Sequence, residues 1–149
     1  MAAILHTEKL CKSFSNGGIQ QHVIKNPDIE ITEKDFTVIM GASGSGKSTL
    51  LYALSGMDTP TLGNVFFGDT DISKYTNDQL AVFRRENCGF VFQSIVMLTH
   101  DLRTALRGSR IIYLRDGAVI GEHKMPRYGT NDVKKRQESL QAFLDEMVW

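Results

Sequence analysis

The stretch that decides the fold of this chain is Gly41-Ala42-Ser43-Gly44-Ser45-Gly46-Lys47-Ser48-Thr49. It fits the phosphate-binding pattern G-x-x-x-x-G-K-[ST] without a mismatch. Glycines let the backbone curl so that successive N–H groups point at phosphate oxygens, and the next helix adds the partial positive charge of its amino end. In such a loop Lys47 reaches the β- and γ-phosphates and the Ser48 hydroxyl is a ligand of Mg²⁺. The stretch therefore predicts a P-loop that binds a nucleoside triphosphate.

Both flanks of the stretch have the structure that this motif requires. Residues 36–40 are a short apolar run bounded by turn signals, as expected of a buried parallel strand. After the loop, apolar residues at 50, 51, 53 and 54 have helical spacing, and Gly56 is placed to end that helix. Strand, glycine loop and helix in this order favour a P-loop over a flexible Gly/Ser-rich linker.

Composition limits the remaining classes of function. The chain has 149 residues, enough for one domain with its own core. Its 17 basic residues balance 17 acidic ones, so the charge gives no argument for a nucleic-acid partner. No apolar run approaches the ~20 residues of a membrane span, and we expect no signal peptide. Cys11 and Cys88 are isolated, which favours reduced thiols and a cytoplasmic location.

The rest of the sequence predicts alternating strands and helices. We expect β-structure in residues 3–32, with Phe14 just before a turn, and a capping box at Thr76 and Gln79 that opens a helix to about Glu86. The later elements are an apolar strand at 89–92, a strand at 95–101, a short helix at 102–106, a hairpin at 110–120 about Asp116-Gly117, and a helix at 131–149 with its apolar stripe packed on the domain. The predicted class is α/β.

These motifs together resemble the ATP-binding subunit of ATP-binding-cassette (ABC) transporters, from about residue 4 to residue 124. The most similar branch serves lipoprotein release, macrolide export and antimicrobial-peptide export. The segments that carry the resemblance are Lys12-Ser13-Phe14, the P-loop, residues 83–93, residues 98–101 and residues 111–117. The implied fold is a RecA-like parallel core with an N-terminal antiparallel β subdomain.

The resemblance implies roles that the residues alone do not. Phe14 matches an aromatic that stacks on adenine, Gln93 a residue that contacts Mg²⁺ and the attacking water, and His100 one that holds the γ-phosphate. Taken by itself, Phe14 is more typical of a core position, and a lone glutamine or histidine of a structural one. The implied cofactors are ATP and Mg²⁺, held by Gly41, Ser43, Gly44, Ser45, Gly46, Lys47, Ser48 and Thr49, with Ser48 and Gln93 on the metal.

The family also implies partners: a membrane permease, a second cassette in a homo- or heterodimer, and therefore a peripheral position at the inner face of the cell membrane. The chain departs from the family between Gln93 and His100, which only residues 94–99 separate. A helical subdomain, the LSGGQ signature and the Walker B Asp-Glu pair, on the order of a hundred residues, should lie there. We expect impaired hydrolysis, since positioning and electrostatics supply most of phosphoryl-transfer catalysis.

The short segment between Gln93 and His100 also raises a question about the order and direction of the strands in the sheet. The strands before Gln93 and His100 should be parallel members of one sheet, and a parallel crossover needs about a dozen residues or more. We therefore expect residues 89–98 to form one long strand, or one strand to leave its place. Our expected organisation is a truncated nucleotide-binding domain at 1–126 with a C-terminal helix at 127–149. The alternatives are a non-catalytic module that pairs with an intact cassette or permease, a non-functional remnant, and, with less support, a P-loop kinase.

Overall fold

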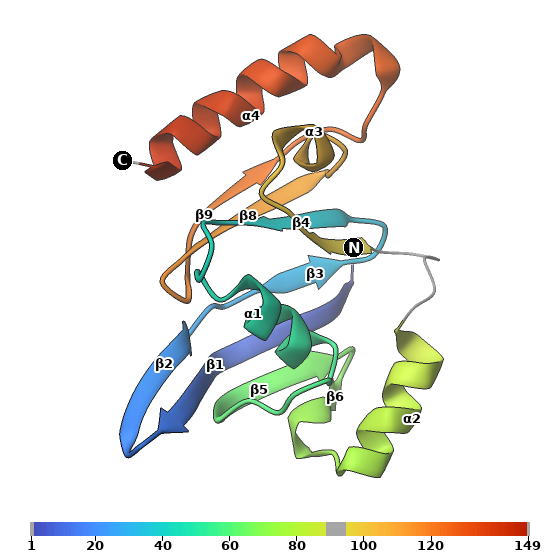
Figure 1. Cartoon of the computed structure of the whole chain (residues 1–149). Coiled ribbons are helices and arrows are strands. Elements are labelled where there is room, and N and C mark those ends of the chain that lie inside the picture. Colours follow the sequence, from blue (N-terminus) through green and yellow to red (C-terminus); the bar gives the residue numbers. More distant parts are fainter. Residues whose placement is uncertain (1, 89–94, 149) are drawn as a thin grey trace.

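The strands of the protein form two sheets that share a core with the helix following the P-loop (Figure 1). The computed structural model describes residues 2–88 and 95–148. The predicted strand at 89–92 and the predicted site residue Gln93 lie outside those residues. The α/β class with an N-terminal antiparallel part and a P-loop core is confirmed.

The first sheet is antiparallel and contains the N-terminal part of the chain. Its strands are β1 (Ala3–Asn16), β2 (Ile19–Lys25), β3 (Glu30–Thr32), β5 (Leu62–Phe67) and β6 (Thr70–Asp71). They pair in the order β2-β1-β5-β6, and β3 pairs with β1. The long strand β1 is therefore the centre of this sheet, and the expectation of β-structure in residues 3–32 is confirmed.

The second sheet carries the P-loop. Its strands are β4 (Phe36–Met40), β7 (Ile95–Leu98), β8 (Arg110–Arg115) and β9 (Ala118–Lys124), in the order β7-β4-β8-β9. Strands β7 and β8 both run parallel to β4, and β9 returns antiparallel to β8. The turn between β8 and β9 has φ of 49° at Asp116 and 79° at Gly117, as a two-residue hairpin turn requires.

The helices are α1 (Lys47–Leu54), α2 (Asn77–Asn87), α3 (Leu102–Ala105) and α4 (Val133–Val148), with short 3₁₀ turns η1 (Ile72–Lys74) and η2 (Thr130–Asp132). The predicted capping box of α2 is present. The amide of Gln79 donates to Thr76 Oγ1 over 3.3 Å, and the amide of Thr76 donates to Gln79 Oε1 over 2.8 Å. Among the described residues, no helix combines the length and the apolar character needed to cross a bilayer.

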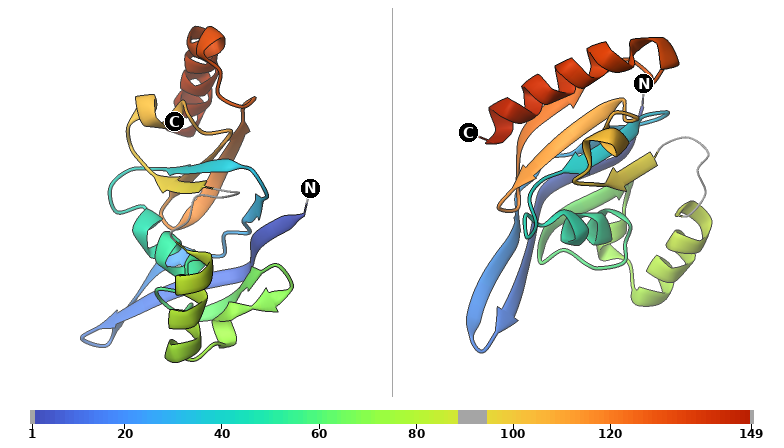
Figure 2. Two further views of the ribbon diagram at one scale, coloured as in Figure 1. Left: turned by 90° about the vertical axis from the view of Figure 1, so that its right-hand side faces the viewer. Right: turned by 45° about the horizontal axis from the view of Figure 1, so that its top comes forward.

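The two faces of β4 enter two different cores. Ile39 belongs to the core that joins both sheets to α1 and α2, whereas Val38 and Met40 belong to the core beneath α3 and α4. Alternate residues of a strand point to opposite faces, so one apolar run serves both cores. Leu140 of α4 is fully buried and Phe143 is 8% exposed, which confirms that the apolar stripe of this helix packs on the domain (Figure 2).

Two details differ from the sequence predictions. Phe14 is not a core residue, because 46% of its surface is exposed near the end of β1. The strand predicted over 95–101 ends at Leu98, because Asp101 is the N-cap of α3. Strand β7 lies beside β4 in parallel register, so β7 is not a strand that has left the sheet. Whether residues 89–98 form one long strand stays a prediction, because 89–94 lie outside the described residues. Cys11 and Cys88 are free thiols, as predicted.

Candidate phosphate-binding site

The sheet brings the P-loop and His100 to the same edge of the molecule. In the parallel register, Ile39 of β4 pairs with Leu98 of β7, so these strands end side by side. The amide of Thr99 donates to the carbonyl of Ile39 over 3.2 Å, which fixes the chain just before His100 beside the start of the loop. Ligands of open α/β sheets bind at this carboxyl edge.

The ammonium group of Lys47 lies folded over its own loop. Its Nζ donates to the carbonyls of Gly41 and Ala42, each over 2.7 Å, and to Ser45 Oγ over 3.4 Å. These acceptors are neutral, and among the described residues Lys47 forms no ion pair with a carboxylate. Burial lowers the pKa of Lys47 from its ordinary value, because desolvation penalises the charged form. The loop thus presents a cation that an anion can stabilise.

The amino end of α1 adds backbone donors beside that cation. Its N-cap is Gly46, which has φ of 96°, and no side chain caps the helix. The first amides of an α-helix have no partner inside the helix, so those of Lys47, Ser48 and Thr49 are available to a ligand. Ser43, Gly44 and Ser48 are exposed around this end, whereas Ser45 is buried and can offer a ligand little beyond its backbone.

Two backbone contacts hold the loop in its curled form. A Cβ at Gly41 would lie 2.2 Å from the carbonyl oxygen of Leu114 in β8, so only glycine permits this close approach. The amide of Gly117 donates to the carbonyl of Ser45 over 3.0 Å, and its own carbonyl accepts from the amide of Lys25 over 2.8 Å. Sequence reasoning identified Gly117 as a turn residue and missed its contact with the loop.

The residues at this site fit a triphosphate. The cation, the uncapped amides and the space that the glycines leave all favour an anion, and no acidic side chain lies within 41–49. For Mg²⁺ the site provides the Ser48 hydroxyl. Nowhere in 2–88 and 95–148 do three His, Cys, Asp or Glu side chains gather as a metal site of their own. Mg²⁺ keeps several waters and takes phosphate oxygens as ligands, so one hydroxyl is compatible with binding alongside nucleotide.

The part of the carboxyl edge that follows β7 has fewer groups that could bind or activate a ligand. His100 is exposed in the bend between β7 and α3. The next residue, Asp101, accepts from the Thr104 amide over 2.9 Å and from Thr104 Oγ1 over 2.7 Å, both at Oδ2. These hydrogen bonds lower the pKa of the Asp101 carboxyl below its ordinary value. A carboxylate with a lowered pKa is a weak general base, so Asp101 serves as a helix cap.

Phe14 lies on the hairpin formed by β1 and β2 with an exposed ring. The Lys12 ammonium is 5.2 Å from the centroid of that ring. Lys12 is itself fixed by Asp58, 2.7 Å from its Nζ, and by the Thr59 carbonyl at the same distance. An exposed aromatic face of this kind can stack on a base, and the adenine-binding role of Phe14 stays a prediction.

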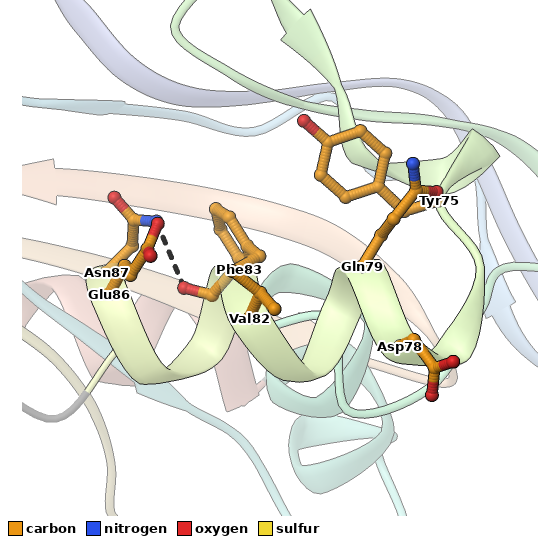
Figure 3. Close-up of a pocket in the computed structure, with 7 residues that line it drawn as sticks. All are labelled: Tyr75, Asp78, Gln79, Val82, Phe83, Glu86 and Asn87. Atoms are coloured by element: carbon orange, nitrogen blue, oxygen red, sulfur yellow. Dashed lines mark hydrogen bonds between the residues drawn. The ribbon is translucent and has the colours of Figure 1, made fainter.

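A separate hollow of about 440 Å³ lies along α2 (Figure 3). Its walls include the side chains of Asp78 and Glu86 but no Lys or Arg, so its charge opposes a phosphate ligand. One amide group there is already engaged, since Asn87 Nδ2 donates to the carbonyl of Phe83 over 3.0 Å. The P-loop is therefore the better candidate for the nucleotide.

Comparison with known proteins gives a consistent result. The profile of the family described as ABC transporter matches residues 24–147. A lipoprotein-releasing system ATP-binding protein, LolD of Idiomarina loihiensis, is 42% identical over 91 residues, or 61% of this chain and 40% of that protein. A macrolide export ATP-binding/permease protein, MacB of Brucella abortus, is 44% identical over 93 residues, or 62% of this chain and 14% of that protein. This chain thus spans less than half the length of either relative.

Solved structures share the fold. The dimeric structure of MJ0796, a bacterial ABC transporter cassette, matches with a TM-score of 0.77 and 21% identity over 83% of this chain and 100% of that one. A dimeric post-hydrolysis state of the same cassette bound to ADP and Pi matches with a TM-score of 0.75 and 19% identity, over 83% of this chain and 100% of that one. At this level of identity the likeness concerns the fold alone.

Proposed function

The chain belongs to the ABC transporter family, and from this premise we propose that it is an ATP-binding subunit of an exporter that holds ATP with Mg²⁺ but hydrolyses it slowly or not at all. The observation that carries the proposal is the state of Lys47. Its ammonium is bonded only to neutral acceptors, next to the uncapped first turn of α1. A partly buried cation with no carboxylate at ion-pair distance among the described residues favours the binding of phosphate.

Each residue of the loop has a proposed task. Lys47 exchanges its carbonyl contacts for the β- and γ-phosphates, and the amides of Gly44 and Gly46 and of the first helical turn surround them. Ser48 supplies a hydroxyl to Mg²⁺, an ion that neutralises phosphate charge when bound. Phe14 stacks on the adenine, while Gly41, Ser43, Ser45 and Thr49 shape the loop around the phosphates. His100 contacts the γ-phosphate from the bend after β7. The role proposed for Gln93, a contact with the metal and the attacking water, comes from the sequence, because this residue is not among those described.

The proposed loss of turnover rests on the carboxylates near this edge. Hydrolysis needs a group that orients or deprotonates the attacking water. Asp101 is occupied as the cap of α3, and Asp116 lies exposed in the turn after β8. Neither the sequence nor the described part of the sheet offers an Asp-Glu pair after an apolar strand. The chain therefore has the P-loop groups that bind the phosphates but, among its described residues, lacks a carboxylate placed to orient or deprotonate the attacking water.

The partners proposed for the chain follow its relatives. MacB is described as an ATP-binding/permease protein and LolD as part of a lipoprotein-releasing system, so we propose a membrane permease as partner and a peptide, lipoprotein or drug as cargo. MJ0796 is described as dimeric, which supports pairing with a second cassette. Such a complex places the chain on the inner face of the cell membrane.

Thermal unfolding with ATP, measured with and without Mg²⁺, tests the proposal. A ligand that binds only the folded state stabilises it by RT ln(1 + [L]/Kd), or about 2.7 kcal/mol at a concentration of 100 Kd. We expect ATP to raise the Tm of the chain, Mg²⁺ to enlarge this shift, and Lys47→Ala to remove it. A Tm that ATP leaves unchanged in a cooperatively folded protein would contradict the proposal.

A further inference from the structure

A second cavity, of about 160 Å³, lies at the opposite edge of the P-loop sheet. It is formed by the linker that follows β9 and by the first turns of α4, which Figure 1 shows above the sheet and away from the loop before α1. Lys124 at its rim pairs with Arg110, the first residue of β8, whereas the P-loop follows the last residue of β4. The cavity is thus separate from the nucleotide site.

The inner wall of this cavity contains a buried cation. Arg136 is only 4% exposed. Its Nε and Nη2 donate to the carbonyl of Leu106 over 3.1 and 2.9 Å, Nη2 also donates to that of Gly108 over 2.6 Å, and Nη1 donates to that of Pro126. All these acceptors are neutral, and within the described residues Arg136 has no carboxylate at ion-pair distance.

The neutral carbonyls hold Arg136 without cancelling its charge, and Asp132, the acidic residue in the cavity lining, compensates that charge only in part. Burial lowers the pKa of the guanidinium from its ordinary value, because desolvation penalises the charged form. Arginine stays protonated in proteins, and desolvation outweighs the attraction of Asp132, so part of the penalty remains until a further anion approaches. The centroid of the Tyr128 ring lies 5.6 Å from Cζ of Arg136 and 5.9 Å from Cζ of Arg107. The guanidinium of Arg107 is therefore a second cation near this wall of the cavity.

The other lining residues add to the same charge. Lys124, Arg127 and Lys135 also line the cavity, against a single acidic residue, Asp132. Lys135 and Arg136 stand in the first turn of α4, where the helix dipole disfavours cations. Residues that are unfavourable for local structure, such as cations in the first turn of a helix, are commonly kept for function. Here these cations concentrate positive charge around a small cavity.

We propose that this cavity binds a phosphate group, as free phosphate or as the headgroup of an anionic lipid. Its volume lies below the roughly 300–1,000 Å³ of pockets for drug-sized ligands, so it admits a small oxyanion and excludes a nucleotide. Arg127 and Lys135, both exposed, contact the anion from the rim of the cavity, and the buried charge of Arg136 attracts it from the inner wall. The ligand class follows from charge and size and does not depend on the nucleotide site.

The test uses inorganic phosphate and a full-length protein in which Lys47→Ala disables the P-loop. Amide chemical shifts are followed by NMR during a phosphate titration, with those of Gly129 and Ser139 as reporters of the cavity and those of Gly44 and Gly46 as reporters of the loop. We expect saturable shifts at the cavity reporters. Adding Lys135→Ala or Arg127→Ala should raise the Kd for phosphate at least about tenfold, because each removes a charge-assisted contact.

Lys134 provides the matched control, since it is an exposed lysine of the same turn that does not line the cavity. Lys134→Ala should leave the Kd unchanged. Flotation with phosphatidylglycerol vesicles, compared with phosphatidylcholine vesicles, distinguishes the two sources of the phosphate group. Binding to phosphatidylglycerol vesicles that depends on Lys135 and not on Lys134 identifies a lipid headgroup. Phosphate binding without flotation identifies free phosphate. The proposal is overturned if the cavity amides do not shift and no vesicles bind, or if Lys134→Ala weakens binding as much as Lys135→Ala.

Discussion

Two halves of one sheet edge differ in how firmly the fold holds them. The P-loop half is fixed on several sides: Gly41 lies against Leu114, Ser45 is bonded to Gly117, and Lys47 is bonded to its own loop. The His100 half follows β7, whose residues Ile95–Leu98 are all only partly buried, and leads into a helix of four residues. The part of the edge that we propose to bind phosphate thus has many contacts with the rest of the fold, and the part that would take part in cleavage has few.

This difference separates binding from catalysis. Backbone amides and one ammonium suffice to hold a triphosphate, and the chain supplies them from consecutive residues. Cleavage needs groups from several strands to converge on the γ-phosphate and the water. A chain that loses residues between Gln93 and His100 can therefore keep the first ability and lose the second.

The strongest way to break the comparison is to remove the central cation. Lys47→Ala should weaken ATP binding about 100-fold or more, because two charge-assisted contacts at about 1.5–3 kcal/mol each are lost. Isothermal titration measures the change, and Lys74→Ala, which removes an exposed lysine paired with Asp71, is the control. ATP binding that survives Lys47→Ala would place the nucleotide elsewhere.

The next effect concerns the turn that supports the loop. A Cβ at Gly117 would lie 2.0 Å from the carbonyl oxygen of Val23, so Gly117→Ala should lower the free energy of unfolding by about 1–3 kcal/mol and weaken ATP binding as well. Gly18→Ala is the matched control, because Gly18 also has a positive φ, 84°, but no atom within 4 Å of the added methyl group. Equal losses in chemical denaturation would show that backbone strain, and not the close contact with Val23, sets the cost.

A smaller effect should follow from changing the sparse half of the edge. His100→Ala should weaken ATP binding about fivefold and leave ADP binding unchanged, because a single hydrogen bond to the γ-phosphate contributes about 1 kcal/mol. Competition against a fluorescent nucleotide gives both constants. If ATP and ADP lose affinity equally, His100 does not contact the γ-phosphate.

The smallest effect is a dependence on pH. The folded chain holds the pKa of Lys47 below 10.5, so between the two values the unfolded chain binds more protons at this site. The free energy of unfolding should therefore rise slightly with pH in this window in the wild type, relative to Lys47→Met. Denaturant titrations of both proteins in nucleotide-free buffer measure the difference, and parallel pH profiles would show that burial does not affect this lysine.

Local signals in the sequence predicted most of the fold because each has a local cause. The P-loop pattern, the Thr76–Gln79 capping box and the Asp116-Gly117 turn all specify backbone geometry within a few residues, and the structure confirms each. The alternation that sends Ile39 and Met40 to different cores could not be read from an apolar run, since neighbours on both faces decide it.

Long-range contacts explain what the sequence did not reveal. The bonds from Gly117 to Ser45 and from Arg136 to Leu106 join residues far apart in the chain, and no periodicity encodes them. Phe14 illustrates the reverse: an aromatic residue favours the core on average, but its position near the end of β1 exposes it. The part of the site that rests on Gln93 lies outside the described residues and stays a prediction.

The central claim is that the chain binds ATP and does not turn it over at the rate of a transporter. Steady-state phosphate release with saturating ATP and Mg²⁺, on protein whose ATP binding has been verified by titration, tests it most directly. The account predicts that release by the wild type stays far below the turnover of a transporter and close to that of Lys47→Ala protein. Release at the rate of a transporter that disappears in Lys47→Ala would contradict it, because some group of this chain would then be positioning the attacking water.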